Sequence, residues 1–179
     1  MSENAVVSEV VEGQGWAAGH LDALGEGWGF RKVRVPLGVT SMGANALVLP
    51  PRYQAGFHYH DEQEEIYFVH AGDVELEFGD GAVARLAPGS VARVDANTVR
   101  RLRNLSDEDA VIFVVGAKGG YIGRDAHLAN ETDHGGPIEG CHNPGVSIEY
   151  SERLKRIPAY PAASAYALPE DVALLASNE

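Results

Sequence analysis

Short runs of Val, Ile, Leu, Phe and Tyr, separated by Gly, Pro, Asn and Asp, extend from Arg31 to about Gly116. Such runs favour antiparallel strands, because strands are short, rich in β-branched and aromatic residues, and bounded by turn residues. Many short strands at this spacing predict an all-β sandwich or small barrel. The predicted strands are Lys32–Leu37, Ala44–Leu49, Gln54–His60, Glu65–His70, Asp73–Phe78, Val83–Leu86, Ser90–Val94, Thr98–Asn104 and Ala110–Val115.

Two local patterns support these strands. Apolar residues alternate with glutamates over Val74–Phe78, which predicts one buried and one solvent-facing side, and the pair Asp80-Gly81 then signals a tight turn. A second turn is predicted at 95–98, where Asn97 tolerates a positive φ better than most residues.

The remainder of the chain is predicted to form two arms. Residues 1–30 precede the barrel of residues 31–116, and residues 117–179 follow it as a glycine-rich arm. Short helices are expected over Ser147–Arg156 and from Pro169. Because the arm has too few periodic apolar positions for a core of its own, we expect it to pack on the barrel or on a partner chain.

Charge and composition restrict the partners. The chain has 14 Lys and Arg against 26 Asp and Glu, a net charge of -12, which repels nucleic acids and anionic membranes. The single cysteine, Cys141, cannot form an intrachain disulfide. The first residues do not resemble a signal peptide, and no apolar run approaches the roughly 18 residues of a membrane span. We therefore expect a cytoplasmic protein.

His58 and His60 are the first candidates for chemistry. They lie two residues apart in a strand-like run, so their imidazoles share one face. Glu65 begins the next predicted strand, close enough across a hairpin to add a carboxylate. Two imidazoles and a carboxylate are a common ligand set for catalytic metals. The alternative is a pair of ordinary strand histidines.

The order of these residues carries a family resemblance. His58-Tyr59-His60, then Glu65, then Gly72 is similar to the first signature motif of the cupins. The resemblance implies a cupin-type double-stranded β-helix, a jelly-roll-like small barrel, in which His58, His60 and Glu65 bind the metal. The family's leading glycine falls at Arg52, where this sequence departs from the motif.

The second cupin motif is only half present. Gly89 and Asn104 have the spacing of that motif, but Asp95, Asn97 and Arg100 replace the family's Pro, Gly and His. The resemblance therefore covers roughly residues 47–115.

Arg100 stands where the family has its fourth metal ligand. A guanidinium cannot donate a lone pair to a metal, and its parity points it into the barrel. In one alternative, His58, His60 and Glu65 hold a metal with open positions, and Arg100 receives an anionic substrate. In the other, Arg100 pairs with Glu65, and its fixed charge replaces the metal.

Parity and spacing also predict where the side chains of several other residues lie. Tyr67 lies two residues after Glu65 and is predicted to face the same cavity, where it could position a ligand, act as an acid, or simply fill the barrel. His70 has the opposite parity, which predicts an outward side chain. The later group has no regular zinc spacing and is expected in exposed loops: His127, His134, Cys141 and His142.

Two functions follow. The resemblance implies a mononuclear metal-dependent oxygenase, isomerase or lyase for a small polar or anionic molecule. Tyr67 and Arg100 are the expected catalytic residues, beside one divalent ion (Fe, Mn, Zn, Ni or Co) on His58, His60 and Glu65. The alternative is a metal-free cupin that binds or senses a small molecule. Because cupin barrels commonly bury their edge strands between two copies, we also expect a homodimer.

Overall fold

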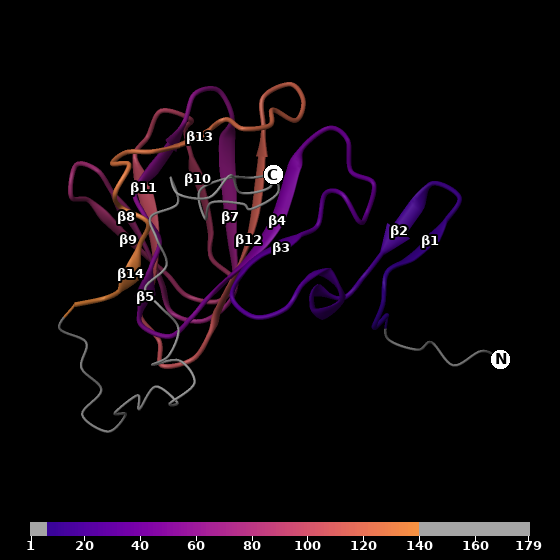
Figure 1. Cartoon of the computed structure of the whole chain (residues 1–179), viewed down its shortest axis with the longest axis horizontal. Coiled ribbons are helices and arrows are strands. Elements are labelled where there is room, and N and C mark those ends of the chain that lie inside the picture. The colour runs from indigo at the N-terminus through magenta and orange to yellow at the C-terminus, as the bar shows by residue number, and fades with distance from the viewer. Residues whose placement is uncertain (1–6, 140–179) are drawn as a thin grey trace, which may run out of the picture.

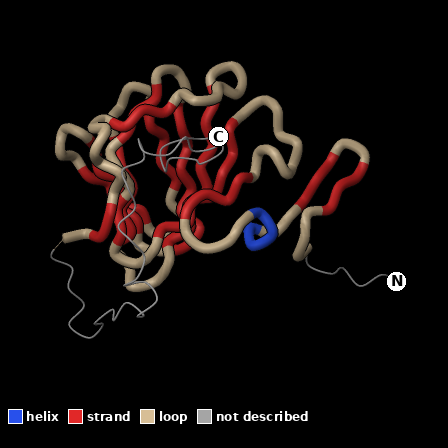
Figure 2. The backbone as a smooth tube through the Cα atoms, viewed as in Figure 1, coloured by secondary structure: helices blue, strands red, loops and turns tan. Residues whose placement is uncertain are grey.

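The computed structural model describes residues 7–139, and nearly all of their regular structure is β-strand. Two sheets face each other and form the barrel, while a hairpin of β1 (Val11–Gly13) and β2 (Trp16–Ala18) projects from its side (Figure 1). A short 3-10 helix, η1 (Leu21–Leu24), links this hairpin to the barrel (Figure 2). The all-β small barrel predicted from the sequence is confirmed.

The first sheet has five antiparallel strands in the order β10-β7-β12-β4-β3. Their bounds are β3 (Gly29–Lys32), β4 (Gly43–Leu49), β7 (Glu64–Ala71), β10 (Val91–Val94) and β12 (Ala110–Ala117).

The second sheet is centred on β11, which pairs with β5, β6 and β8. At its margins β13 pairs with β6, β14 pairs with β5, and β9 pairs with β8. The bounds are β5 (Tyr53–Gln54), β6 (His58–His60), β8 (Val74–Phe78), β9 (Val83–Leu86), β11 (Arg100–Asn104), β13 (Ala126–Leu128) and β14 (Gly136–Pro137).

The core lies between the sheets because each strand alternates inward and outward residues. On β7, Glu65, Tyr67 and Val69 are buried, whereas the residues between them are exposed. The same alternation on β12 buries Ile112 and Val114. The apolar core cluster comprises Leu47, Leu49, Tyr67, Val69, Val74, Leu76, Leu86, Val94, Leu102, Ala110, Ile112 and Val114.

Both predicted turns form. The Asp80-Gly81 turn closes the β8–β9 hairpin, with Gly81 at a φ of 85° and the Asp80 carboxylate accepting the amide of Ala82. The second turn is closed by a hydrogen bond from the Thr98 amide to the Asp95 carbonyl. Asn97 does not take a positive φ there, since Arg52 and Arg124 are the non-glycine residues with that conformation in the described chain.

Two strand predictions were wrong in extent. The predicted strand Lys32–Leu37 ends at Lys32, because the following residues turn, with the Gly38 amide bonded to the Val35 carbonyl. The predicted strand Gln54–His60 is two strands. A Cβ at Gly56 would lie 2.1 Å from the Asp133 carbonyl oxygen, so the chain breaks where another segment crosses it.

Arg52 occupies the position of the family's leading glycine and has a φ of 53°. This is the left-handed region that favours glycine. Its backbone also joins two segments, because the Arg52 amide donates to Ser106 and its carbonyl accepts the amide of Ile138.

The described part of the glycine-rich arm, residues 117–139, pairs with the barrel through β13 and β14. The predicted helices over Ser147–Arg156 and from Pro169 lie outside the described residues. Within residues 7–139 no helix has the length and apolar character needed to cross a membrane.

Candidate metal centre

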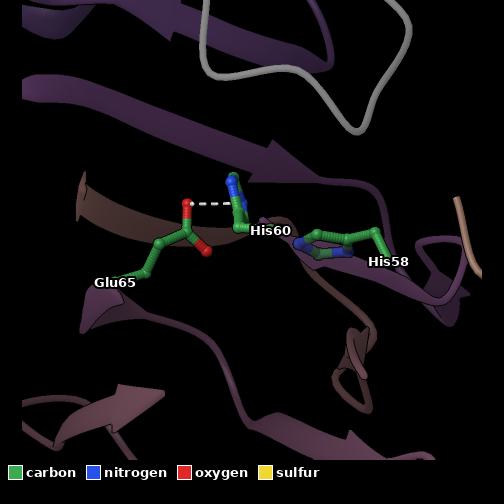
Figure 3. A group of neighbouring side chains, drawn as sticks. All are labelled: His58, His60 and Glu65. Carbon is green, nitrogen blue, oxygen red and sulfur yellow. Dashed lines mark ion pairs between the residues drawn. The ribbon is translucent and has the colours of Figure 1, made fainter. Parts of the chain in front are cut away.

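Two adjoining strand regions bring the candidate ligands together. His58 and His60 lie on β6, and Glu65 lies near the start of β7. His60 and Glu65 are 1% and 2% exposed, and His58 is half-buried. The three side chains turn toward one another inside the barrel (Figure 3), which is the arrangement expected from their period-two spacing.

One nitrogen of each imidazole and one carboxylate oxygen of Glu65 all lie within 4.8 Å of one another. His60 Nε2 is 3.3 Å from Glu65 Oε1. The two imidazole rings stand edge to face at 76°, with centroids 5.8 Å apart. These donors therefore enclose one common point.

Asp125 holds the other side of His60. Its Oδ2 lies 3.4 Å from His60 Nδ1, and its carboxylate accepts the backbone amides of Glu62 and Gln63. A carboxylate beside one imidazole nitrogen favours the proton there and leaves the lone pair on the other. His60 has a carboxylate beside each ring nitrogen, Asp125 at Nδ1 and Glu65 at Nε2, so Asp125 would accept the Nδ1 proton when Nε2 binds a metal.

Sequence reasoning missed Asp125. The residue comes from the glycine-rich arm just before β13 and has no spacing relation to the histidines. Its recognition requires the pairing of β13 with β6, which brings Ala126 opposite His60.

The two oxygens of Glu65 have different neighbours. Oε1 faces His60, whereas Oε2 accepts hydrogen bonds from Arg100 Nη2 at 2.6 Å and from the Tyr67 hydroxyl. Burial opposes ionisation, but the hydrogen bond and charge of His60, together with Arg100, hold the pKa of Glu65 well below its ordinary value. Glu65 is therefore a carboxylate at neutral pH.

Arg100 is fully buried on β11 and bonds to protein groups with all three of its nitrogens. Nε donates to the Tyr67 oxygen at 3.2 Å, and Nη2 donates to Glu65. Nη1 donates to the carbonyls of Ala96 and Thr98 at 3.1 and 3.0 Å. Arg100 thus pairs with Glu65, as in the second of the two alternatives derived from the sequence. To receive an anion, as in the first, the guanidinium would have to give up some of these bonds.

Tyr67 faces the same cavity, as its parity predicted, and is 2% exposed. Burial, followed by the neighbouring Glu65 charge, raises the pKa of its phenol well above the ordinary value. The phenol therefore stays protonated and donates to Glu65, so Tyr67 and Arg100 together orient one ligand carboxylate.

His58 is neutral over the physiological range. Burial, then the charge of Arg100, lowers its pKa to about 4. Its Nδ1 lies 3.4 Å from the Gly56 carbonyl oxygen. A neutral imidazole keeps the lone pair that metal binding requires.

This donor set fits a divalent transition metal. Two imidazoles and one carboxylate oxygen converge, and Arg100 and Tyr67 bind the other carboxylate oxygen. Three protein ligands with further positions open are typical of catalytic sites. Asp125 supplies the outer carboxylate that commonly supports a metal-binding histidine.

The other histidines of the described chain lie elsewhere. His70 is exposed on the outer face of β7, which confirms the parity prediction, and His134 is exposed. His127 is exposed as expected, but on strand β13, where its Nε2 lies 2.8 Å from Asp61 Oδ2 and its ring stacks on Tyr59. Cys141 and His142 lie outside the described residues.

One comparison with protein families agrees with this fold. A family model described as "Cupin domain" matches residues 46–116. Similar solved structures include a sugar phosphate isomerase of the cupin superfamily from Silicibacter pomeroyi (27% identity, 50% of this chain and 58% of that chain, TM-score 0.46). A DMSP lyase from Ruegeria pomeroyi is also similar (25% identity, 50% of this chain and 43% of that chain, TM-score 0.44). So is a cupin protein from Bacteroides fragilis (23% identity, 51% of this chain and 77% of that chain, TM-score 0.47).

The matches span less than two thirds of the isomerase and of the lyase. No curated protein matches the sequence.

Proposed function

We propose that this chain, whose residues 46–116 match the family model described as "Cupin domain", is a metal-dependent enzyme for a small polar or anionic molecule. In this proposal one divalent transition metal ion binds to His58, His60 and Glu65. The observation that carries it is the convergence of three buried or half-buried donors within 4.8 Å. Two of these donors, His60 and Glu65, are in turn contacted by neighbouring polar side chains.

Each supporting residue has a specific task. Asp125 would accept the Nδ1 proton of His60 when Nε2 binds the metal, and burial keeps His58 neutral. Arg100 and Tyr67 fix the carboxylate plane of Glu65 through Oε2. A bound metal would supply Lewis acidity to a substrate oxygen. The protein's contribution is a ligand set that is already oriented before the metal arrives.

The charge of the site favours an anionic or strongly polar substrate. A divalent ion and the Arg100 guanidinium together exceed the single negative charge of Glu65, so the loaded site has a net positive charge. In this proposal Arg100 and Tyr67 are positioning residues, and the substrate reaches the open side of the ligand set.

A metal-free binding cupin is the second candidate, and the Arg100–Glu65 ion pair favours it. A fixed guanidinium already neutralises the buried carboxylate, so the site has no electrostatic need for a metal. In that case the barrel binds a small molecule without turnover.

The two candidates are separated by assaying the protein with a panel of small carboxylates, hydroxy acids and sugar phosphates, before and after chelator treatment. Oxygen uptake identifies an oxygenase, and NMR of the mixture identifies isomerised or cleaved products. Turnover that disappears with the chelator and returns with one added metal supports the enzyme. A panel member that raises the melting temperature equally with and without chelator, and is not converted, supports the metal-free binder.

A further inference from the structure

A pocket of about 410 Å³ lies on the outer face of the first sheet, between that sheet and the segment around η1. Its floor includes Arg31 of β3, Val48 of β4 and Val111 of β12. His70 also lines it, and on β7 this residue has the opposite parity to Glu65. The sheet therefore separates this pocket from the candidate metal centre.

Arg31 is a buried cation without an acidic partner in the described chain. It is 8% exposed, and its Nη2 donates to the carbonyl of Gly27. Among residues 7–139 no carboxylate oxygen lies within 4 Å of it, whereas Arg100, which is buried more deeply, has Glu65 as its partner. A guanidinium offers five N–H donors, and a buried charge is costly without a counterion.

The loop before β3 packs on this guanidinium. A Cβ at Gly25 would lie 3.1 Å from Arg31 Cδ and 3.6 Å from its Nη1. Gly25 and Gly27 have positive φ values of 156° and 65°, which glycine adopts without steric cost. The loop thus covers Arg31 from one side, and the side chain lines the pocket on the other.

The rim of the pocket has the opposite charge. Asp22 is on η1 with its side chain 88% exposed, and Asp109 precedes β12. Asp109 Oδ1 accepts a hydrogen bond from Trp28 Nε1 at 3.1 Å, which holds the indole beside the opening. A buried cation therefore lies below two carboxylates and an aromatic ring.

We propose that this pocket binds a small zwitterion of the amino-acid class. The ligand carboxylate pairs with Arg31, whose planar fork matches it. The ammonium group lies at the rim, where Asp22, Asp109 and the Trp28 ring all favour a cation. An apolar side chain lies against Val48 and Val111. A dianion such as phosphate fits less well, because it would have to approach two carboxylates.

The tryptophans provide a direct probe. The sequence has two, Trp16 and Trp28, so the Trp16→Phe variant retains one indole, at the pocket. Its emission is titrated with L-valine, with isovalerate, which lacks the ammonium, and with isobutylamine, which lacks the carboxylate. Inorganic phosphate is the fourth probe. We expect saturable binding of valine, at least about tenfold tighter than binding of the other three probes.

Three variants in the same background assign the contacts. Arg31→Gln should weaken valine binding at least about tenfold, to the level of isobutylamine. Asp109→Asn removes one of the two rim carboxylates and should shift the affinity for valine toward that for isovalerate. Arg31→Lys keeps the charge without the fork and should also weaken valine, which covers the case in which Arg31→Gln misfolds. Arg85→Gln is the control, because Arg85 is an exposed arginine paired with Asp73 on the other sheet.

Circular dichroism of every variant should match the parent, apart from an Arg31→Gln protein that fails to fold. The proposal is overturned if no probe gives a saturable change at tens of millimolar, or if valine binds no tighter than isovalerate and isobutylamine. Tighter binding of phosphate than of valine, or equal binding of valine by the parent and a folded Arg31 variant, would overturn it as well.

Discussion

Arg100 Nη2 lies 2.6 Å from Glu65 Oε2, and both side chains are almost completely buried, at 0% and 3% exposed. Arg100, at the position that the cupin resemblance assigns to a fourth metal ligand, thus supports Glu65, the proposed third ligand. The guanidinium binds one carboxylate oxygen of Glu65, and His60 faces the other. Glu65 can therefore keep its ion pair with Arg100 through Oε2 while Oε1 is available to a metal.

The first prediction concerns this pair. Arg100→Ala leaves Glu65 buried without its cation and should lower the free energy of unfolding by about 3–5 kcal/mol. Urea denaturation of the chelator-treated protein measures the change. The matched control is Arg93→Ala, whose exposed ion pairs with Glu64 and Asp95 should contribute little to the free energy of unfolding. An Arg100→Ala protein as stable as the control would show that the pair has no structural role.

The second prediction concerns Asp125. Asp125→Asn keeps an oxygen for the amides of Glu62 and Gln63 but loses the charge beside His60 Nδ1. Metal affinity should fall about 10- to 100-fold, as measured by competition with a chromogenic chelator. The exposed Asp107→Asn, whose carboxylate pairs with Arg52, is the control and should bind metal normally. Equal affinities in the two variants would remove Asp125 from the site.

The third prediction is a pH dependence from His58. Its pKa is lowered from 6.5 to about 4 in the folded protein, chiefly by burial. Between these two values the unfolded chain binds the proton more readily than the folded chain, so stability falls as pH falls through this window. The loss amounts to about 3 kcal/mol at most. His58→Asn should show a correspondingly smaller loss between pH 6.5 and 4 in urea denaturation. An unchanged pH dependence in this variant would contradict the assignment.

The fourth prediction is assembly as a homodimer through the outer face of the first sheet. Ile66 and Phe68 of β7 and Val91 of β10 are 46%, 40% and 65% exposed, and Phe68 pairs directly with Val91. Neighbouring exposed apolar side chains mark interaction surfaces. Sedimentation should report a dimer that Phe68→Glu dissociates.

The control for assembly is Val83→Glu, which changes an exposed apolar residue of the second sheet and should leave the dimer intact. A monodisperse wild-type monomer at micromolar concentration would contradict the prediction.

The strands and the ligand triad could be predicted because both follow local periodicity. Because alternate residues of a strand point to the same face, His58 and His60 share one face, and Tyr67 points into the barrel like Glu65. Contacts between distant segments could not be predicted this way. Asp125 reaches His60 only after β13 pairs with β6, and the break at Gly56 depends on the backbone of Asp133.

Arg100 shows the same limit within the motif itself. Its chemistry excludes a bond to a metal, and its parity predicts that its side chain points into the cavity. The sequence alone does not decide whether its partner is an anionic substrate or Glu65. The choice depends on the distance across β6, β7 and β11, which only the folded barrel defines.

The most direct test of the account is the metal content of protein purified without chelator, measured by elemental analysis for wild type and two double variants. We expect up to one first-row transition metal per chain in wild type and none in His58→Ala/His60→Ala. The control, His70→Ala/His134→Ala, removes two exposed histidines and should retain the metal. Wild-type protein that binds no metal even after incubation with Fe, Mn, Co, Ni or Zn, or a His58→Ala/His60→Ala variant that keeps its metal, would contradict the central claim.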